Sequence, residues 1–228
     1  FALSGGASAA VELIRKFEER FGAVLTEGYG LTETSAMVSM NPLDGVRKPG
    51  SVGVPLPELE FCIKDPTGAE VPAGEVGEVC SRGPVNMPGY WKREDATAQV
   101  IDEDGWFHTG DLGRVDEDGY LYIVDRLKDL IIHGGYNVYP REIEEAMYEH
   151  PGVLEAAVLG TDDEHYGQIV TAVITPMPGV TLTEEEIEAF ARERLSAYKI
   201  PRIIKFVDAL PKGPSGKILK RAIDVSQL

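Results

Sequence analysis

The sequence has few basic residues and no long apolar run. Its 22 lysines and arginines are outnumbered by 38 aspartates and glutamates, which leaves a net charge of −16 over 228 residues. Such an acidic chain repels phosphate backbones and anionic lipids, which argues against a nucleic-acid partner or a membrane surface. No apolar stretch approaches the roughly 20 residues of a transmembrane helix. We therefore expect a globular protein without a transmembrane segment.

Cysteine and histidine are also scarce, and their spacing does not indicate a metal site. Cys62 and Cys80 lie in strand-like segments without a Cys-x-x-Cys pair. We interpret them as reduced packing residues of a cytoplasmic protein, with a disulfide as the less favoured alternative. The histidines do not fall at the spacing of zinc ligands, so no zinc site is expected; they are His108, His133, His150 and His165.

Two acidic tetrads, Asp-Glu-Asp-Gly at 102–105 and again at 116–119, could be interpreted as calcium loops. They lack the longer ligand spacing of an EF-hand. Each is followed by an aromatic, strand-like segment, which favours a hairpin turn. We predict turns at both places.

Residues 1–40 have the pattern of an α/β unit. Apolar residues recur at helical spacing within 10–21, with charged residues on the other face, and Gly22 ends the predicted helix. Residues 1–3 are apolar throughout, as in a parallel strand buried on both faces. A second strand is expected at 23–26, leading into a glycine-rich loop at the carboxyl end of the sheet, where such folds bind ligands.

Residues 41–124 show no helical period of any length. Short strands are expected at 59–64, 76–81 and 120–124, separated by proline and glycine turns. This pattern is typical of a small antiparallel barrel or sheet. The charged segment 125–129 follows, and we predict a hinge there.

Residues 130–228 predict a compact α+β domain. Pro140 begins a helix at the position where proline is tolerated, and Thr183 with Glu186 forms a capping box for a second helix. The expected strands are 153–159, 169–175 and 203–207. The predicted fold is thus the end of a parallel α/β subdomain, a barrel-like antiparallel subdomain, and an α+β domain after the hinge.

Three short segments carry groups suited to a nucleotide and its activation. Gly-Tyr-Gly-Leu-Thr-Glu at 28–33 joins glycines and a hydroxyl to a carboxylate, which suits an α-phosphate and its metal ion. Asp111 follows Thr109-Gly110, and one carboxylate can accept hydrogen bonds from both ribose hydroxyls. Lys217 ends the loop Pro-Lys-Gly-Pro-Ser-Gly-Lys, which makes it a mobile point charge for phosphate.

In this order, with Asp-Arg-Leu-Lys-Asp at 125–129, the segments resemble the adenylate-forming superfamily of acyl-CoA synthetases, luciferases and peptide-synthetase adenylation domains. The string Trp-Phe-His-Thr-Gly-Asp at 106–111 is highly specific to that superfamily. Ile-Ile-His-Gly-Gly-Tyr-Asn-Val-Tyr-Pro at 131–140 is most similar to bacterial fatty-acid–CoA ligases, whereas plant coumarate ligases and luciferases have lysines in place of Ile132 and Gly134. The resemblance runs from about Ser4 to Arg221.

The resemblance assigns roles to the matching residues. Glu33 would bind Mg²⁺, Thr32 would contact the α-phosphate, and Tyr29 would stack on adenine. Asp111 would accept the ribose hydroxyls, and Lys217 would be the catalytic lysine. Gly5, Gly6 and Ala7 would wall the adenine pocket, and Gly28 and Gly30 would shape the phosphate loop. Arg126 would reach the nucleotide from the hinge. Lys128 would be the pivot of a domain rotation, and Gly135 would line the path of CoA.

Three of these residues, Glu33, Asp111 and Lys217, also have an ordinary structural interpretation. Glu33 is a residue type that a helix N-terminus favours, Asp111 is a residue type common in turns, and most lysines such as Lys217 are solvated. A P-loop at 213–217 is excluded, because that motif needs four residues between its glycines and Ser or Thr after its lysine. It is the combination of motifs that favours the functional interpretation.

By resemblance, the protein is expected to be an ATP-dependent acid–CoA ligase that activates a fatty acid with ATP and Mg²⁺ and transfers it to CoA. The alternatives are an adenylation domain that delivers to a carrier protein and a non-catalytic fragment. Family members are considerably longer and carry a Ser/Thr/Gly-rich phosphate loop upstream of the segment matched by 4–7. No such loop occurs here, the chain begins at Phe1, and its first methionine is Met37. We expect the C-terminal part of a larger enzyme.

Overall fold

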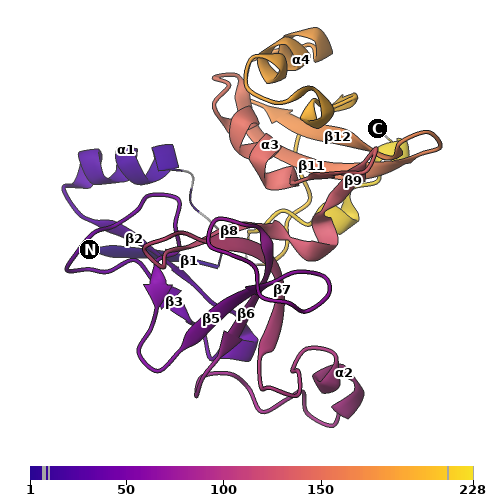
Figure 1. Cartoon of the computed structure of the whole chain (residues 1–228). Coiled ribbons are helices and arrows are strands. Elements are labelled where there is room, and N and C mark those ends of the chain that lie inside the picture. The colour runs from indigo at the N-terminus through magenta and orange to yellow at the C-terminus, as the bar shows by residue number, and fades with distance from the viewer. Residues whose placement is uncertain (7–8, 10, 215, 228) are drawn as a thin grey trace. The chain divides into compact units, whose positions relative to one another are not determined.

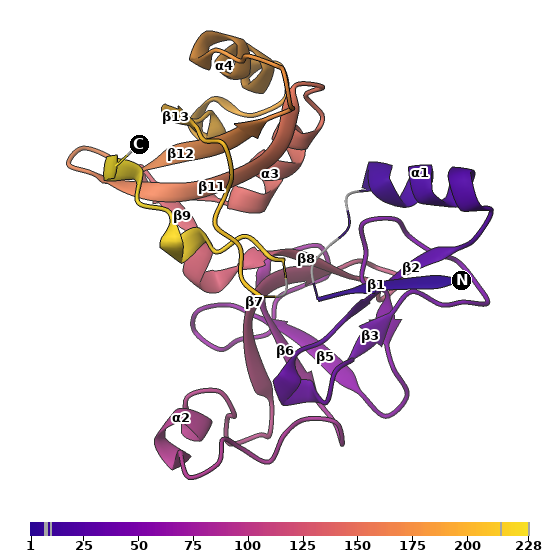
Figure 2. The ribbon, with the colours of Figure 1, turned by 180° about the vertical axis from the view of Figure 1, so that it is seen from behind.

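The computed structural model describes residues 1–6, 9, 11–214 and 216–227. The chain forms two compact units, Phe1–Leu127 and Lys128–Leu228, shown from opposite sides in Figures 1 and 2. We call them unit 1 and unit 2 and describe each separately. The boundary lies inside the charged segment 125–129. Within the described ranges, no helix combines the length and the apolar character needed to cross a membrane.

Unit 1 begins with a four-stranded sheet in the order β1-β2-β3-β4. β1 and β2 are parallel, as expected for the end of an α/β subdomain, and the other pairs are antiparallel. Gly22, at φ 62°, ends the helix where the sequence predicted. The elements are β1 (Ala2–Gly5), α1 (Val11–Phe21), β2 (Leu25–Tyr29), a 3₁₀ turn (Thr32–Thr34), β3 (Ser39–Met40) and β4 (Val54–Pro55).

One detail of β1 differs from the prediction. We expected the first residues to form a strand buried on both faces, but Leu3 is 47% exposed and the burial of β1 alternates along the strand. An apolar run alone does not distinguish a strand covered on both faces from one covered on a single face.

The second sheet of unit 1 contains only antiparallel pairs, in the open order β5-β6-β7-β8. The expected strands are present, but among the described residues no pair closes the sheet into a barrel. The short helix α2 was not predicted, because its five residues are too few to display a helical period. The elements are β5 (Glu60–Lys64), β6 (Gly77–Arg82), α2 (Glu94–Ala98), β7 (Phe107–Val115) and β8 (Leu121–Arg126).

Both acidic tetrads are turns, as predicted. The amide of Asp102 donates to the carbonyl of Trp106, and the amide of Asp116 donates to the carbonyl of Tyr120, each at 3.0 Å. The ammonium of Lys48 lies 2.6 Å from a carboxylate oxygen of Asp116 and 2.6 Å from one of Asp118. The 116–119 turn therefore directs its carboxylates to a lysine.

A small apolar core, built around Val52, Ile63, Val79 and Leu121, supports the second sheet of unit 1. Tyr29, the last residue of β2, packs against this core. The backbone of Leu121 also exchanges hydrogen bonds with the segment before β4, at Val52 and Gly53, each of 2.8 Å. These contacts hold the end of β2 beside the sheet that carries the predicted aspartate.

Unit 2 is a five-stranded sheet with two helices. The order is β10-β9-β12-β11, and β13 runs parallel beside β12. The predicted helices and strands are present. They are β9 (Ile131–His133), β10 (Tyr136–Val138), α3 (Pro140–Tyr148), β11 (Val153–Asp163), β12 (Gly167–Pro176), α4 (Glu184–Arg192) and β13 (Ile203–Phe206), with 3₁₀ turns at Leu127–Asp129, Ala197–Lys199, Lys220–Ala222 and Val225–Gln227.

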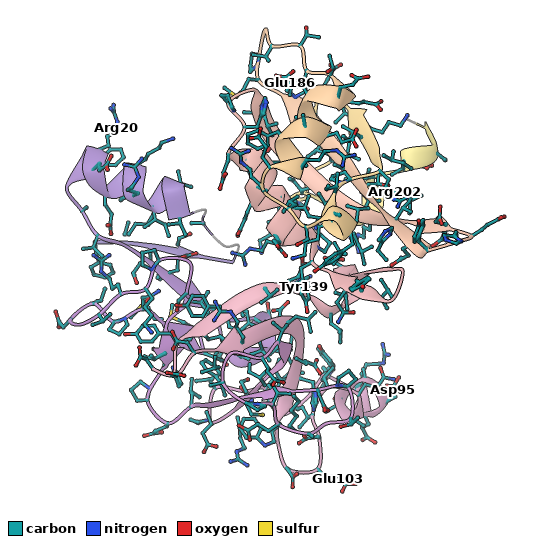
Figure 3. The ribbon with its side chains drawn as sticks, turned by 45° about the horizontal axis from the view of Figure 1, so that its top comes forward. Arg20, Asp95, Glu103, Tyr139, Glu186 and Arg202 are labelled. Atoms are coloured by element: carbon teal, nitrogen blue, oxygen red, sulfur yellow. The ribbon has the colours of Figure 1, made fainter. Side chains whose placement is uncertain are left out.

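The capping box that begins α4 is formed on one side. The hydroxyl of Thr183 accepts the amide of Glu186 at 3.2 Å. The Glu186 carboxylate lies 3.5 Å from Nε2 of His150, and Figure 3 shows Glu186 and Arg202 among the side chains of this unit.

Both faces of the β11–β12 pair are covered. Alternate residues such as Ala156 and Val158 pack with α3 and α4 in the larger core. Ala157 and Val173 point to the opposite face, where they meet Leu210 and Ile218 of the C-terminal segment. This second contact anchors the residue that follows Lys217.

Candidate nucleotide and catalytic residues

Asp111 is the centre of a small polar cluster in unit 1. It lies on β7 opposite Arg126 on β8. Its Oδ2 accepts the hydroxyl of Tyr29 at 2.6 Å, and its Oδ1 lies 3.4 Å from Nε of Arg126. The structure thus brings together three of the predicted nucleotide residues, which are far apart in the sequence.

The part of β7 that carries Asp111 is fixed from both sides. The Thr109 hydroxyl donates to the carbonyl of Val79 at 2.8 Å and accepts the amide of Asp111 at 3.1 Å. Gly110 has φ 69°, a conformation that glycine adopts without strain, and its amide donates to Oε1 of Glu78 at 3.0 Å. Glu78 was not predicted, because nothing near it in the sequence indicates this bond.

The electrostatics of the cluster keep Tyr29 in its donor form. Burial and the neighbouring Asp111 carboxylate raise the pKa of Tyr29 well above its usual range. The phenol therefore stays protonated and donates to the aspartate. Asp111 is only 7% exposed, and its two oxygens contact Tyr29 and Arg126.

The predicted phosphate loop lies next to the predicted adenine wall. Gly5 on β1 pairs directly with Gly28 on β2, and Gly6 has φ 80°. Ala7 lies outside the described residues. Gly30 has no room for a side chain, because a Cβ there would lie 2.0 Å from the carbonyl oxygen of Ala36. The backbone packing of the loop thus requires this glycine.

Glu33, the predicted magnesium ligand, lies in the 3₁₀ turn Thr32–Thr34. Its Oε1 accepts the hydroxyl of Tyr90 at 2.9 Å, and its carbonyl accepts the amide of Met87 at 2.7 Å. The hydrogen bond with Glu33 raises the pKa of Tyr90. A carboxylate beside the exposed hydroxyl of Thr32 is a set of hard oxygen donors, which suits Mg²⁺. Tyr90 was not predicted, since it comes 57 residues later.

Lys217 lies in unit 2 on a tight loop. The amide of Gly213 donates to the carbonyl of Lys217, and the amide of Gly216 donates to the carbonyl of Gly213, each at 2.9 Å. The lysines on either side are held by ion pairs of 2.7 Å, Lys212 with Glu155 and Lys220 with Glu144. Lys217 is exposed, and no ion pair is formed by its ammonium within the described part of the chain.

The remaining predicted residues of unit 2 lie at its beginning. Gly135 is the second residue of the β9–β10 turn, in which Gly134 and Gly135 have φ of 57° and 85°. Two successive positive φ values are the requirement of a type I′ hairpin turn. Beside this turn, Tyr136 stacks on Tyr198 with ring centroids 4.7 Å apart. Lys128 is the first residue of the unit.

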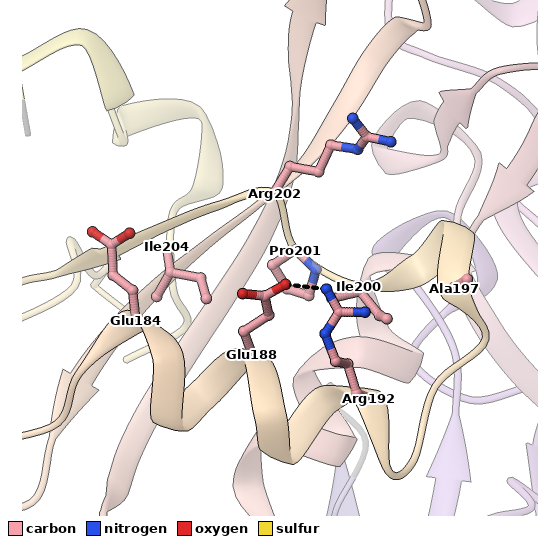
Figure 4. A pocket seen from close by; sticks show the side chains of 8 residues that line it. All are labelled: Glu184, Glu188, Arg192, Ala197, Ile200, Pro201, Arg202 and Ile204. Atoms are coloured by element: carbon pink, nitrogen blue, oxygen red, sulfur yellow. Dashed lines mark hydrogen bonds and ion pairs between the residues drawn. The ribbon is translucent and has the colours of Figure 1, made fainter.

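A separate cavity of about 500 Å³ lies between α4 and the segment before β13 (Figure 4). Arg192 forms an ion pair with Glu188 in this cavity. Arg202 stacks over the ring of Tyr166 at 4.3 Å. None of the predicted site residues lines this cavity. The residues that line it are Glu184, Glu188, Arg192, Ala197, Ile200, Pro201, Arg202 and Ile204.

Known proteins resemble this chain over nearly its whole length. It is 46% identical to a long-chain-fatty-acid–CoA ligase of Bacillus subtilis over 97% of the chain and 40% of the ligase. It is 43% identical to a feruloyl-CoA synthase of Amycolatopsis over 96% of the chain and 44% of that enzyme. The structure of ATP-bound MatB from Rhodopseudomonas palustris superposes with a TM-score of 0.92 at 40% identity, over 96% of this chain and 44% of that one.

These matches cover nearly the whole of this chain but only part of each relative. The chain spans about 40% of the length of the B. subtilis ligase. Residues 1–91 match the family model of the AMP-binding enzymes, and residues 142–217 match that of the AMP-binding enzyme C-terminal domain. The chain belongs to the AMP-binding family of adenylate-forming enzymes.

Proposed function

We propose that this chain is part of a longer ATP-dependent acid–CoA ligase, and that the acid is a fatty acid. The observation that carries the proposal is the placement of Asp111, buried and fixed between Tyr29 and Arg126. The names of the relatives support the reaction class, since both curated enzymes described above form CoA thioesters. The segment 131–140 favours a fatty acid, because it is most similar to bacterial fatty-acid–CoA ligases.

Unit 1 would hold the nucleotide. Asp111 would accept both ribose hydroxyls, and Tyr29 and Arg126 would keep its carboxylate oriented for them. Gly5, Gly28 and Gly30 would let the backbone approach the adenine and the α-phosphate. Thr32 would donate its hydroxyl to that phosphate.

Glu33 would hold the magnesium ion, oriented by its hydrogen bond from Tyr90. Magnesium bound there would withdraw charge from the phosphate oxygens as the acid attacks. No other step of the proposal depends on the ion.

Lys217 would act on the charge that develops when the carboxylate attacks the α-phosphate and pyrophosphate leaves. Within the described residues, the exposed ammonium of Lys217 forms no ion pair and could therefore reach that charge, while hydrogen bonds hold the backbone of its loop. The thioester step would use the segment around Gly135, with Lys128 as the pivot of a motion between the two half-reactions.

The enzyme would work in the cytoplasm, and it would need more than this chain for full activity. Both cysteines are unpaired, which suits the reducing cytoplasm. Positioning of the acid and the phosphates contributes many orders of magnitude to such reactions. We therefore expect the 228-residue chain alone to form acyl-CoA far more slowly than the longer ligase.

The test is to replace Asp111 with alanine in the longer ligase and to measure both half-reactions. Hydrogen bonds to a charged group contribute about 1.5–3 kcal/mol each, so we expect pyrophosphate exchange and thioester formation both to fall, by roughly 10–100-fold. Asp104→Ala, which removes an exposed acid from a nearby turn, is the matched control and should change neither. Equal behaviour of the two variants, or a loss confined to one half-reaction, would reject the ribose assignment.

A further inference from the structure

A row of metal-binding side chains crosses the second sheet of unit 1, apart from the nucleotide residues. Cys62 on β5 lies directly opposite Cys80 on β6, and Cys80 lies opposite His108 on β7. Side chains two residues apart on a strand leave the same face of the sheet, and Glu78 comes two residues before Cys80. The register of three strands therefore gathers two thiols, an imidazole and a carboxylate.

The distances between these groups are close to those of a zinc site. Sγ of Cys80 lies 3.5 Å from Nδ1 of His108, which lies 2.8 Å from Oε2 of Glu78. These three ligand atoms all lie within 4.8 Å of one another. Cys62 lies opposite Cys80 in the β5–β6 register but outside this group of three. Ligand atoms about 2.0–2.3 Å from a tetrahedral zinc ion lie roughly 3.3–3.8 Å apart, so small shifts would place the three ligand atoms of Glu78, Cys80 and His108 around one ion.

The residues around these four side chains resemble those that surround and orient the ligands of a metal site. Cys80 is fully buried and Cys62 is 4% exposed. Nδ1 of His108 faces the thiol of Cys80, and Nε2 of the same ring lies 3.4 Å from Oδ2 of Asp102. Metal-binding histidines almost always donate their second ring N–H to such an acceptor, which fixes the tautomer and the ring orientation. Lys64 contacts the same Asp102 oxygen at 2.6 Å, which adds a positive charge beside the acidic groups.

We propose that Cys80, His108 and Glu78 bind one thiophilic divalent cation, and that the side chain of Cys62, which lies opposite Cys80 on β5, turns toward the ion as the fourth ligand. Zn²⁺ is the ion that this donor set suits. Four protein ligands leave no open position, so the site would be structural. Each thiol would release its proton to solvent as its sulfur binds the metal, and no electrons are transferred. Oε1 of Glu78 would keep its bond with Gly110, and the ion would thereby hold the part of β7 just before Asp111 in place.

The test uses the 228-residue chain, reduced and freed of metal with a chelator. After one equivalent of Zn²⁺ and dialysis, we expect one zinc per chain by elemental analysis. Co²⁺ in place of Zn²⁺ should give a thiolate-to-cobalt charge-transfer band together with the absorption of tetrahedral cobalt. Zinc lost on dialysis, or a cobalt spectrum without the thiolate band, would overturn the proposal. Neither measurement involves ATP, acid or CoA, so the result is independent of the proposed ligase activity.

Variants sharpen the assignment. Cys80→Ser and His108→Gln should each lower zinc affinity at least tenfold, whereas His165→Asn, which removes an exposed histidine in an acidic turn of unit 2, should leave it unchanged. Asp102→Asn should lower affinity by roughly 10–100-fold without removing the thiolate band, because it acts through the histidine. Because Cys80 is buried and its variant can fail to fold, the wild-type cobalt spectrum and His108→Gln decide the matter without it. Equal loss in His165→Asn would contradict the site.

Discussion

Asp111 in unit 1 and Lys217 in unit 2 carry opposite charges in opposite kinds of surroundings. Asp111 is 7% exposed, and its two oxygens face a tyrosine hydroxyl and an arginine. Lys217 is exposed, and its backbone is held while its ammonium forms no ion pair within the described residues. The contrast is between a charge that is fixed before any ligand arrives and a charge that remains available.

Under the proposed function, this difference would correspond to two tasks. A group that binds the ribose must keep one orientation through both half-reactions, and contacts on both sides provide that. A group that stabilises charge only while pyrophosphate leaves must not be neutralised beforehand by a partner of its own. The paired lysines Lys212 and Lys220 show that the same loop can hold an ammonium in place.

The largest effect is expected from Lys217→Ala in the longer ligase. Loss of a charge that acts on the transition state typically lowers the rate by about 10²–10³, or about 3–4 kcal/mol, and we expect this loss in pyrophosphate exchange. Lys212→Ala and Lys220→Ala are matched controls, because their ammoniums are already bound to Glu155 and Glu144. Comparable losses in all three variants would mean that the loop, and not the free charge, matters.

Tyr29→Phe tests whether the hydrogen bond from Tyr29 holds the carboxylate of Asp111 in place. The ring stays in place while Asp111 loses the hydrogen bond of 2.6 Å. A hydrogen bond to a charged group contributes about 1.5–3 kcal/mol, and we expect a loss of that size in the free energy of unfolding in urea. Tyr122→Phe is the control, since its hydroxyl lies 3.4 Å from the Asp116 carboxylate. If both variants were equally stable, Asp111 would not depend on Tyr29.

Gly30→Ala tests whether the phosphate loop is also rigid. The added Cβ would lie 2.0 Å from the backbone oxygen of Ala36, so the loop would have to move. Overpacking of this kind typically destabilises by about 1–3 kcal/mol, measurable by thermal unfolding of the chain. Gly5→Ala, whose Cβ would meet Gly28 at an ordinary 3.5 Å, should differ from wild type by less than about 0.5 kcal/mol. An unchanged stability for Gly30→Ala would show that the loop yields easily.

The smallest effect concerns the ion pair between Lys48 and the 116–119 turn. Burial alone would raise the pKa of Asp116, but the ammonium of Lys48 and the amides of Tyr120 and Asp118 outweigh it and lower that pKa. The resulting stability is fully present above the unfolded-state aspartate pKa of about 3.9, and it is lost as the pH falls from there through the lowered pKa of the folded protein. Asp116→Asn should lose about 0.5–1 kcal/mol at pH 7, and the difference should shrink below about pH 4. Urea unfolding at pH 7, 5 and 3 measures it, and a pH-independent difference would contradict the assignment.

Sequence patterns predicted those parts of the molecule that depend on neighbouring residues. The helix that begins at Pro140 and the parallel pairing of β1 with β2 follow from local spacing and from capping and turn residues. The resemblance singled out Asp111, Tyr29 and Arg126, and the structure brings them together. Each of these elements and each of these motifs is recognised within its own short stretch of chain.

Contacts set by strand register could not be predicted in the same way. Cys62, Cys80 and His108 become neighbours only because three strands pair in one register, whereas their spacing along the chain gave no metal motif. The same holds for Tyr90 beside Glu33 and for Glu78 beside Gly110. Pairing across a sheet depends on hairpin lengths and bulges, which a single sequence specifies weakly.

The contrast between a fixed aspartate and an exposed lysine is tested most directly by supplying the acyl-adenylate itself. In the longer ligase, Lys217→Ala and Asp111→Ala would each be given chemically prepared fatty acyl-AMP and CoA, and thioester formation would be followed. We predict a rate near wild type for Lys217→Ala, because its charge is needed only while pyrophosphate leaves, and a loss of roughly 10–100-fold for Asp111→Ala, because the ribose must still be held. Equal damage in both variants would contradict the division of roles between the two residues.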